Sequence, residues 1–279
     1  MIAKKRYGQN FILNGHLLSS LVDKINLPDN CTVLEVGAGT GSLTVELAKR
    51  ARDVVTIEID KDLELALRAN LSDFINVEII IGDALQIDWA ALSHMAADAQ
   101  CAPLQVNGRC FVSNLPYYIT TPLMYKAIRS VPVFNIIACM VQKEVADKIK
   151  SPHGGDGYGP LSVWAQGIYN IETAAALPPS AFTPPPTVES EFIILRKKQN
   201  PAFILSDYGA LERLVNAAFS SRRKTILNNL KRIGMTAEQL HLASIPTSSR
   251  AEQLRPEDFA RVARAAECRP YKATCNPSP

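Results

Sequence analysis

The sequence has no closely spaced cysteine pair, which argues against both a zinc site and a disulfide framework. Its six cysteines, at 31, 101, 110, 139, 268 and 275, form no Cys-x-x-Cys pattern and have no histidine at ligand spacing. We therefore expect reduced thiols, no bound metal and a cytoplasmic protein. Histidine is also scarce: the four that occur, His16, His94, His153 and His241, have no acidic or cysteine partner at a suggestive spacing, so none is assigned a catalytic role.

Long hydrophobic runs are absent as well. No apolar stretch approaches the roughly 20 residues that span a bilayer, so we expect no membrane-embedded segment. The opening "MIAKKRYGQN" is basic but has no apolar segment of signal-peptide length behind it. No acidic residue precedes Asp23, which leaves a transit peptide open, although residues 8–13 read as part of the fold.

The sequence carries little net charge, and that charge is unevenly distributed. The total is +3, but residues 1–198 hold 18 Lys and Arg against 20 Asp and Glu, whereas residues 199–279 hold 12 against 7. A basic excess favours a polyanionic partner, because Lys and Arg neutralise phosphates. A solvated helical surface has the same composition, so charge alone leaves both interpretations open.

The order of apolar segments predicts the fold class. A chain of 279 residues with 47% hydrophobic content can bury one large core, or one large and one small. Short apolar runs alternate with helical stretches from residue 31 onward, which is typical of a parallel sheet with helices on both faces. The expected strands are continuous Val- and Ile-rich runs at 31–37, 53–60, 77–83, 109–115 and 135–142, with a last strand at 191–198. The expected crossover helices lie at 42–51, 63–71 and 122–130.

The composition changes near residue 199. Residues 151–160 are rich in glycine and predict a surface loop, and the proline-rich 178–190 predicts an extended segment. Beyond 199 the pattern is purely helical, at 211–220, 222–233, 236–243 and 256–267. We therefore expect an α/β, Rossmann-like domain over 1–198 and a small all-helical domain over 199–279.

The stretch "LEVGAGTGSLT", residues 34–44, predicts a strand, a glycine turn and a helix whose first N–H groups face a ligand. Its spacing is G-x-G-x-G, whereas the dinucleotide fingerprint G-x-G-x-x-G would need glycine where Ser42 stands. Glu35 precedes the turn, in which Gly37 and Gly39 allow close approach of a ligand.

Two further carboxylates end the next strands. Glu58 lies about 20 residues on, where an acid can accept both ribose hydroxyls. Asp83, with Ala84 beside it, ends the third strand, where it could accept from an adenine amino group. Together with the glycine turn these residues fit S-adenosylmethionine better than NAD. Alternatively, Glu35 and Asp83 simply cap helices.

"SNLPYYIT", residues 113–120, places an amide, a proline and two tyrosines at the end of an expected strand. The tetrad Asn114-Leu115-Pro116-Tyr117 resembles the (D/N/S)-P-P-(Y/F) signature of methyltransferases that modify an amino nitrogen on a planar group. Such an amine is a poor nucleophile because its lone pair is delocalised into the ring. Acceptors on its two N–H groups, here Asn114 and by resemblance the Leu115 carbonyl, favour a tetrahedral nitrogen without a general base.

In this interpretation Pro116 orients the carbonyl and Tyr117 offers a face on which an extruded base stacks. The alternative is that Pro116 and Tyr117 close a strand while Asn114 caps the following helix.

Three more stretches narrow the class to a family: "KKRYGQNFI" at 4–12, "FTPPPTVES" at 182–190 and "AFSSRRKTILNNL" at 218–230. With the motifs above, the chain resembles the ribosomal RNA adenine dimethyltransferases, and the third stretch resembles the small-subunit, or KsgA, branch. The resemblance implies a class I methyltransferase sheet. It also implies that two adjacent adenines near the 3′ end of small-subunit rRNA, within a pre-ribosomal small subunit, each receive two methyl groups from S-adenosylmethionine. A monomer with a role in subunit assembly is expected.

By matching position, the resemblance assigns roles to individual residues. Asn10 and Ile12 would close over the cofactor, and Phe182 would stack on the target base opposite Tyr117, although a phenylalanine there could equally be a core residue. Basic side chains expected to contact phosphates are Arg222, Arg223, Lys224, Lys231 and Arg232, and the cluster at 4–6 could also reach RNA. Ile12 stands where the family usually has leucine, and the long connection 89–108 has no functional interpretation.

Three alternatives stay open from sequence alone. The related large-subunit rRNA methyltransferases that confer macrolide resistance share the N-terminal motifs but lack "SSRRKT". A ribosome-assembly or transcription factor with vestigial activity would not need Gly37, Glu58, Asp83 and Asn114 together. A protein-glutamine methyltransferase fits less well because of the basic helical domain and the second aromatic residue at 182.

Overall fold

The computed structural model describes residues 9–92, 108–130, 134–203 and 208–267, and the chain divides into two compact units. The first consists of residues 1–150 and 168–199, the second of residues 151–167 and 200–279. The division after residue 199 agrees with the composition change. The sequence did not predict that 151–167 belongs to the second unit. The long connection 89–108 and the basic cluster 4–6 lie largely or wholly outside the described residues.

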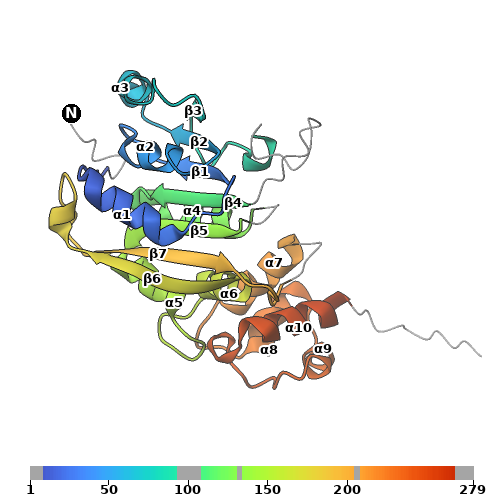
Figure 1. The fold of residues 1–279 in the computed structure, drawn as a ribbon. Coiled ribbons are helices and arrows are strands. Elements are labelled where there is room, and N and C mark those ends of the chain that lie inside the picture. Colours follow the sequence, from blue (N-terminus) through green and yellow to red (C-terminus); the bar gives the residue numbers. More distant parts are fainter. Residues whose placement is uncertain (1–8, 93–107, 131–133, 204–207, 268–279) are drawn as a thin grey trace, which may run out of the picture. The chain divides into compact units, whose positions relative to one another are not determined.

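The first unit is built on a seven-stranded mixed sheet in the order β3-β2-β1-β4-β5-β7-β6 (Figure 1). The strands are β1 (Thr32–Val36), β2 (Asp53–Glu58), β3 (Val77–Ile81), β4 (Arg109–Asn114), β5 (Ile136–Gln142), β6 (Tyr169–Leu177) and β7 (Ser190–Lys197). Strands β1 to β5 run parallel to their neighbours, and β7 is antiparallel to both β5 and β6.

Every strand expected from the sequence is present. The sequence did not predict β6, because this edge strand is partly exposed and alanine-rich rather than a continuous Val and Ile run.

Helices cover both faces of the sheet, as expected. One face packs its buried side chains against α1 (Gly15–Ile25) and α2 (Ser42–Ala48) in a single core. On the other, α4 (Thr120–Ile128) packs on β5, and α5 (Lys143–Lys150) packs on β5 and β7. The helix α3 (Glu64–Asn70) closes a smaller cluster through its Leu67. Strand order reverses between β1 and β4, the position at which open α/β sheets bind ligands beyond their carboxyl ends.

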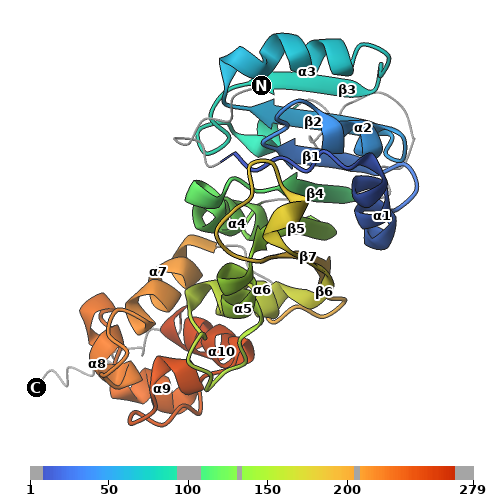
Figure 2. The ribbon, with the colours of Figure 1, turned by 90° about the vertical axis from the view of Figure 1, so that its left-hand side faces the viewer.

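The second unit is helical, as expected beyond residue 199 (Figure 2). Its helices are α6 (Pro160–Ile168, whose last residue belongs to the first unit), α7 (Tyr208–Ala218), α8 (Ile226–Leu230), α9 (Ala237–Leu242) and α10 (Pro256–Glu267). Phe219 stacks on Phe259 with ring centroids 5.8 Å apart, and Thr236 begins α9 with a capping box.

Short 3-10 turns occur in both units. They are η2 (Lys61–Leu63), η3 (Trp89–Ala91), η4 (Tyr117–Ile119) and η5 (Pro179–Ala181) in the first unit, and η6 (Lys231–Ile233) and η7 (Ala251–Gln253) in the second.

Two absences hold for the residues that the structure describes. Among them, no helix is long and apolar enough to cross a membrane. Nor does this part of the chain place three or more His, Cys, Asp or Glu side chains where they could hold a metal ion.

Candidate active site

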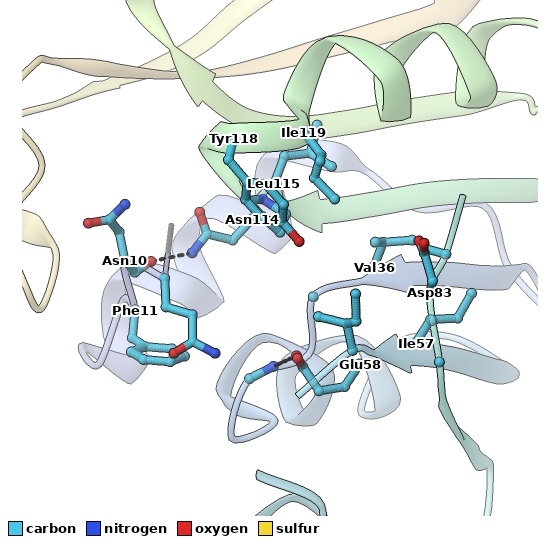
Figure 3. Close-up of a pocket in the computed structure, with 17 residues that line it drawn as sticks. Asn10, Phe11, Val36, Ile57, Glu58, Asp83, Asn114, Leu115, Tyr118 and Ile119 are labelled. Carbon is cyan, nitrogen blue, oxygen red and sulfur yellow. Dashed lines mark hydrogen bonds between the residues drawn. The ribbon is translucent and has the colours of Figure 1, made fainter. Parts of the chain in front are cut away.

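A pocket opens where β1, β2, β3 and β4 end, and residues from the N-terminal segment cover part of it (Figure 3). Its lining residues are Gln9, Asn10, Phe11, Val36, Gly37, Gly39, Ile57, Glu58, Ile59, Gly82, Asp83, Ala84, Asn114, Leu115, Pro116, Tyr118 and Ile119. Six of the residues assigned to the cofactor from sequence are therefore brought together here in addition to Asn114: Asn10, Gly37, Gly39, Glu58, Asp83 and Ala84.

The glycine turn after β1 brings backbone close to the pocket. Gly39 has a φ of 60°, and a Cβ atom there would lie 2.7 Å from Cε1 of Phe11. Gly37 has a φ of 82°, and a Cβ atom there would lie 3.3 Å from Cγ of Pro116. Side chains at these positions would be strained and would also fill the space that the turn leaves beside the N-terminal segment and the Asn114 motif.

Glu58 is fixed by two backbone donors. Its Oε2 accepts from the Gly39 N–H and its Oε1 accepts from the Asp60 N–H, each over 2.8 Å. The side chain is 4% exposed, and burial raises the pKa of its carboxyl above the usual value despite these bonds. Gln9 donates to the Asp60 carboxylate over 3.2 Å, which links the N-terminal segment to the same loop. The carboxylate is thus held in one orientation at the pocket wall.

The loop after β3 is held from behind by Lys126 of α4. Asp83 accepts from the Leu85 N–H over 2.9 Å. The Lys126 ammonium donates to the carbonyls of Ala84, Leu85 and Ile87 over 2.8, 3.0 and 2.6 Å. It also lies 4.8 Å from the ring centroid of Trp89, whose Nε1 donates to the Ala84 carbonyl. Burial lowers the pKa of Lys126 below its usual value. The loop that carries Asp83 is thereby fixed against α4.

Asn114 ends β4 and points into the pocket. Its Nδ2 donates to the main-chain carbonyl of Asn10 over 2.8 Å (Figure 3). The neighbouring Phe11 exchanges two backbone hydrogen bonds with Thr183, of 2.9 and 2.8 Å, which joins the N-terminal segment to the proline-rich segment. Leu115 is buried, and Pro116 has a φ of −61°. Three stretches that are distant in the sequence therefore meet around Asn114.

Comparison with known proteins decides the family. A model of the ribosomal RNA adenine dimethylase family matches residues 2–267. The chain belongs to this family. It is 38% identical over 269 residues to the ribosomal RNA small subunit methyltransferase A of Caldanaerobacter subterraneus, covering 95% of this chain and 97% of the relative. The relative of the same name from Staphylococcus carnosus is 37% identical over 270 residues, with 93% and 88% covered.

Solved structures of similar fold agree with the class I methyltransferase sheet. A dimethyladenosine transferase from Plasmodium falciparum superposes with a TM-score of 0.70 at 24% identity, covering 90% of this chain and 95% of that one. The 23S rRNA methyltransferase ErmE superposes with a TM-score of 0.63 at 27% identity, covering 92% and 100%. Family and fold identify the chain as a methyltransferase.

Two residues assigned to the dimethylase cofactor site lie outside the pocket. Ile12 is 4% exposed and belongs to the same core cluster as the buried residues of α1. Glu35 is 1% exposed and accepts hydrogen bonds from the hydroxyls of Thr44 and Thr56, over 2.6 and 2.7 Å. Burial raises the pKa of Glu35 to about 7. These two hydrogen bonds join β1 to α2 and to β2. Glu35 lies within β1, before the glycine turn, and its side chain contacts the neighbouring elements instead of lining the pocket. The structure therefore gives Glu35 a supporting position.

The aromatic residues of the dimethylase motifs also differ from expectation. Phe182 is 3% exposed and packs in the core, so it presents no face to the pocket. Its stacking role stays a prediction that this conformation does not favour. Tyr117 is partly exposed, and its hydroxyl pairs with Ser190, so it borders the pocket without lining it. The adjacent Tyr118, 47% exposed, lines the pocket instead.

Sequence reasoning missed several lining residues. These are Gln9, Phe11, Val36, Ile57, Ile59, Gly82, Tyr118 and Ile119. Most of them could have been found, because Val36, Ile57 and Ile59 are the last apolar residues of expected strands and Gln9 and Phe11 flank Asn10 in a motif already recognised. Lys126 was missed as well, and a single lysine inside a crossover helix gives no sequence signal.

The five basic residues expected at the RNA interface all lie in the second unit and are exposed. Arg222, however, donates to the carbonyls of Asp156 and Tyr158 over 2.7 and 3.1 Å. These bonds hold the glycine-rich loop 151–160, so Arg222 has a structural contact within the unit. Arg223, Lys224, Lys231 and Arg232 stay predicted phosphate contacts.

Proposed function

We propose that this chain uses S-adenosylmethionine to dimethylate the N6 amines of two adjacent adenines near the 3′ end of small-subunit rRNA. The observation that carries the proposal is the position of Asn114, which faces the same pocket as Gly37 and Glu58. The small-subunit substrate is supported by relatives named ribosomal RNA small subunit methyltransferase A, which match more than nine-tenths of this chain.

The pocket fits the cofactor chemically. Its polar groups include the fixed carboxylates Glu58 and Asp83, suited to ribose hydroxyls and to an adenine amine. Val36, Ile57 and Ile119 provide apolar surface, and the backbone cradle at the glycine turn would be filled by any Cβ atom. Bound there, S-adenosylmethionine supplies an electrophilic methyl group.

Asn114 prepares the target amine for attack. Because Nδ2 already donates to Asn10, the amide is held in one orientation and Oδ1 is left to accept from an N6 hydrogen. The Leu115 carbonyl would accept the other hydrogen. Two acceptors withdraw the nitrogen lone pair from conjugation and direct it toward the methyl donor, and this electrostatic positioning needs no general base.

The second unit would bind the RNA substrate. Its exposed Arg223, Lys224, Lys231 and Arg232 suit contacts with phosphate, which would position the subunit without reading its sequence. We include in the proposal that the enzyme acts as a monomer in the cytoplasm on a pre-ribosomal small subunit.

The proposal is tested with labelled S-adenosylmethionine and unmethylated ribosomal subunits. Small and large subunits are incubated separately with the purified protein, and their nucleosides are separated by mass spectrometry. We expect N6,N6-dimethyladenosine in the small subunit alone. Label in the large subunit would instead assign the ErmE type of activity, which shares this fold. No label in either, with full rescue of a deletion strain by Asn114→Ala, would assign an assembly role without catalysis.

A further inference from the structure

The hydroxyl of Tyr117 and the Oγ of Ser190 are 2.5 Å apart and form a hydrogen bond. Both residues belong to the first unit but come from different motifs. Tyr117 is the last residue of the Asn-Leu-Pro-Tyr tetrad and begins η4, and Ser190 is the last residue of "FTPPPTVES" and begins β7. The bond therefore joins the ends of the two motifs that were quoted separately from the sequence.

Ser190 is the fixed partner of this pair. It is fully buried, and its strand β7 lies between two others, with Ser190 opposite Gln142 of β5 and opposite Leu177 of β6. One residue before it, the Glu189 carbonyl accepts from the Lys143 N–H over 3.0 Å. Since two ladders hold the Ser190 backbone, its hydroxyl has little freedom to follow Tyr117.

Tyr117 is the partner whose position depends on the bond. Its ring is attached at one end to the backbone between Pro116 and Tyr118, and both of these residues line the pocket. The hydroxyl at the far end of the ring bonds Ser190. Burial raises the pKa of the Tyr117 hydroxyl above its usual value, so the group is protonated and able to donate. With both ends held, the direction of the long axis of this partly exposed ring at the pocket rim is fixed.

We propose that Ser190 is a positioning residue, whose hydroxyl fixes the long axis of the Tyr117 ring so that an extruded adenine stacks beside Asn114. The inference rests on the proposed function, because it assigns the ring to the target base. It also gives a reason why a serine ends the proline-rich motif: its side chain reaches the tetrad while its backbone belongs to the sheet. Without the hydroxyl, the tyrosine would keep its aromatic surface but lose its fixed orientation.

The test is a double-mutant cycle between Ser190→Ala and Tyr117→Phe, measured as kcat and KM for unmethylated small subunits. Each single variant is expected to lose about 3- to 10-fold in kcat/KM, the range of one hydrogen bond. The double variant is expected to lose no more than either single one. Dissociation constants for S-adenosylmethionine stay as in the parent, and Ser190→Thr, which keeps the hydroxyl, recovers most of the loss.

A serine outside the first unit serves as matched control. Ser162 is 1% exposed, and its Oγ accepts from the Gly159 N–H over 3.1 Å, so Ser162→Ala removes a similarly buried hydroxyl. We expect it to leave kcat/KM unchanged. Losses at Ser190 and Tyr117 that multiply in the double variant, or a Ser190→Ala variant as active as the parent, would overturn the inference, because Ser190 would then act independently of the tyrosine.

A binding measurement separates this inference from the proposed function. A single-stranded RNA fragment that carries 2-aminopurine at the target position reports stacking by fluorescence quenching, without catalysis. If the parent protein methylates the subunit and quenches the probe, and Ser190→Ala quenches it equally, the inference is refuted and the proposed function stands. Parent protein that does neither refutes the proposed function, and the inference with it. Weaker quenching by Ser190→Ala and by Tyr117→Phe, with methylation by the parent, supports both.

Discussion

The backbone N–H of Gly39 donates to Oε2 of Glu58 over 2.8 Å, and this bond joins the glycine turn after β1 to the acid that ends β2. The other oxygen of Glu58 accepts from the Asp60 N–H. The carboxylate therefore orders two loops while it faces the pocket, and the two features that indicated a cofactor from sequence depend on one another in the structure.

Replacing Glu58 tests this arrangement. In Glu58→Gln one oxygen becomes an NH₂ group that cannot accept from a backbone N–H, and the remaining oxygen loses its charge. We expect the dissociation constant for S-adenosylmethionine, measured by calorimetry, to rise at least about tenfold, as for the loss of a hydrogen bond to a charged group. Glu46→Gln is the matched control, since Glu46 pairs with Lys49 and Arg50 away from the pocket. Equal effects of the two substitutions would contradict a cofactor role for Glu58.

The buried carboxyl of Glu35 should make the free energy of unfolding depend on pH. Burial raises its pKa from 4.5 to about 7, so between these values the folded protein binds more protons than the unfolded chain. The contribution to the free energy of unfolding is fully present below pH about 4.5 and is lost as the pH rises through about 7. Its size is about 3 kcal/mol, because one pKa unit corresponds to about 1.4 kcal/mol.

Glu35→Gln removes this titration while keeping an oxygen for Thr44 and Thr56. Urea unfolding at pH 5 and pH 8 should therefore show a smaller loss of stability in the variant than in the parent. Other groups titrate in both proteins, so the difference between them isolates Glu35. Identical pH profiles would show that the carboxyl is ionised throughout.

The basic residues of the second unit should separate into two kinds. Arg222→Ala removes the donor to the carbonyls of Asp156 and Tyr158 and should lower the free energy of unfolding by about 0.5–1.5 kcal/mol, because water can replace the donor at the exposed Asp156 carbonyl. Arg223→Ala and Lys224→Ala should leave stability unchanged, weaken RNA binding and reduce the salt slope of log K by about 1 each. Filter binding at several salt concentrations, with denaturant unfolding alongside, measures both effects. If Arg222→Ala changed the salt slope and the other two substitutions did not, Arg222 would be the phosphate contact, and Arg223 and Lys224 would not.

The sequence was sufficient for the elements whose patterns are local. The continuous apolar runs from β1 to β5 gave the parallel sheet, and the composition change near residue 199 gave the helical unit. It was not sufficient for β6, whose alanines and exposed positions carry no strand pattern, nor for residues 151–167, whose membership of the second unit depends on long-range contacts.

The site shows the same limit. Glycine spacing and strand ends located Gly37, Glu58 and Asp83, because parallel strands end at one edge of the sheet. Whether the side chain of a motif residue faces the pocket or the core depends on tertiary packing, which local sequence patterns do not reveal. Glu35 and Phe182 were therefore expected in the pocket, whereas both are buried outside it in the structure.

The distribution of methylated products shows whether Asn114 supplies one of the two acceptors for the target amine. N6-monomethyladenine keeps a single N–H, so with Asn114→Ala, which removes the side-chain acceptor, the second transfer depends on the Leu115 carbonyl alone and should slow more than the first. Asn170→Ala, exposed on β6, is the control. Unmodified, monomethylated and dimethylated adenosine are quantified by mass spectrometry over a time course. We predict that monomethyladenosine accumulates with Asn114→Ala but not with the parent or the control; equal loss of both transfers, without monomethyladenosine, would show that Asn114 is not one of the two acceptors.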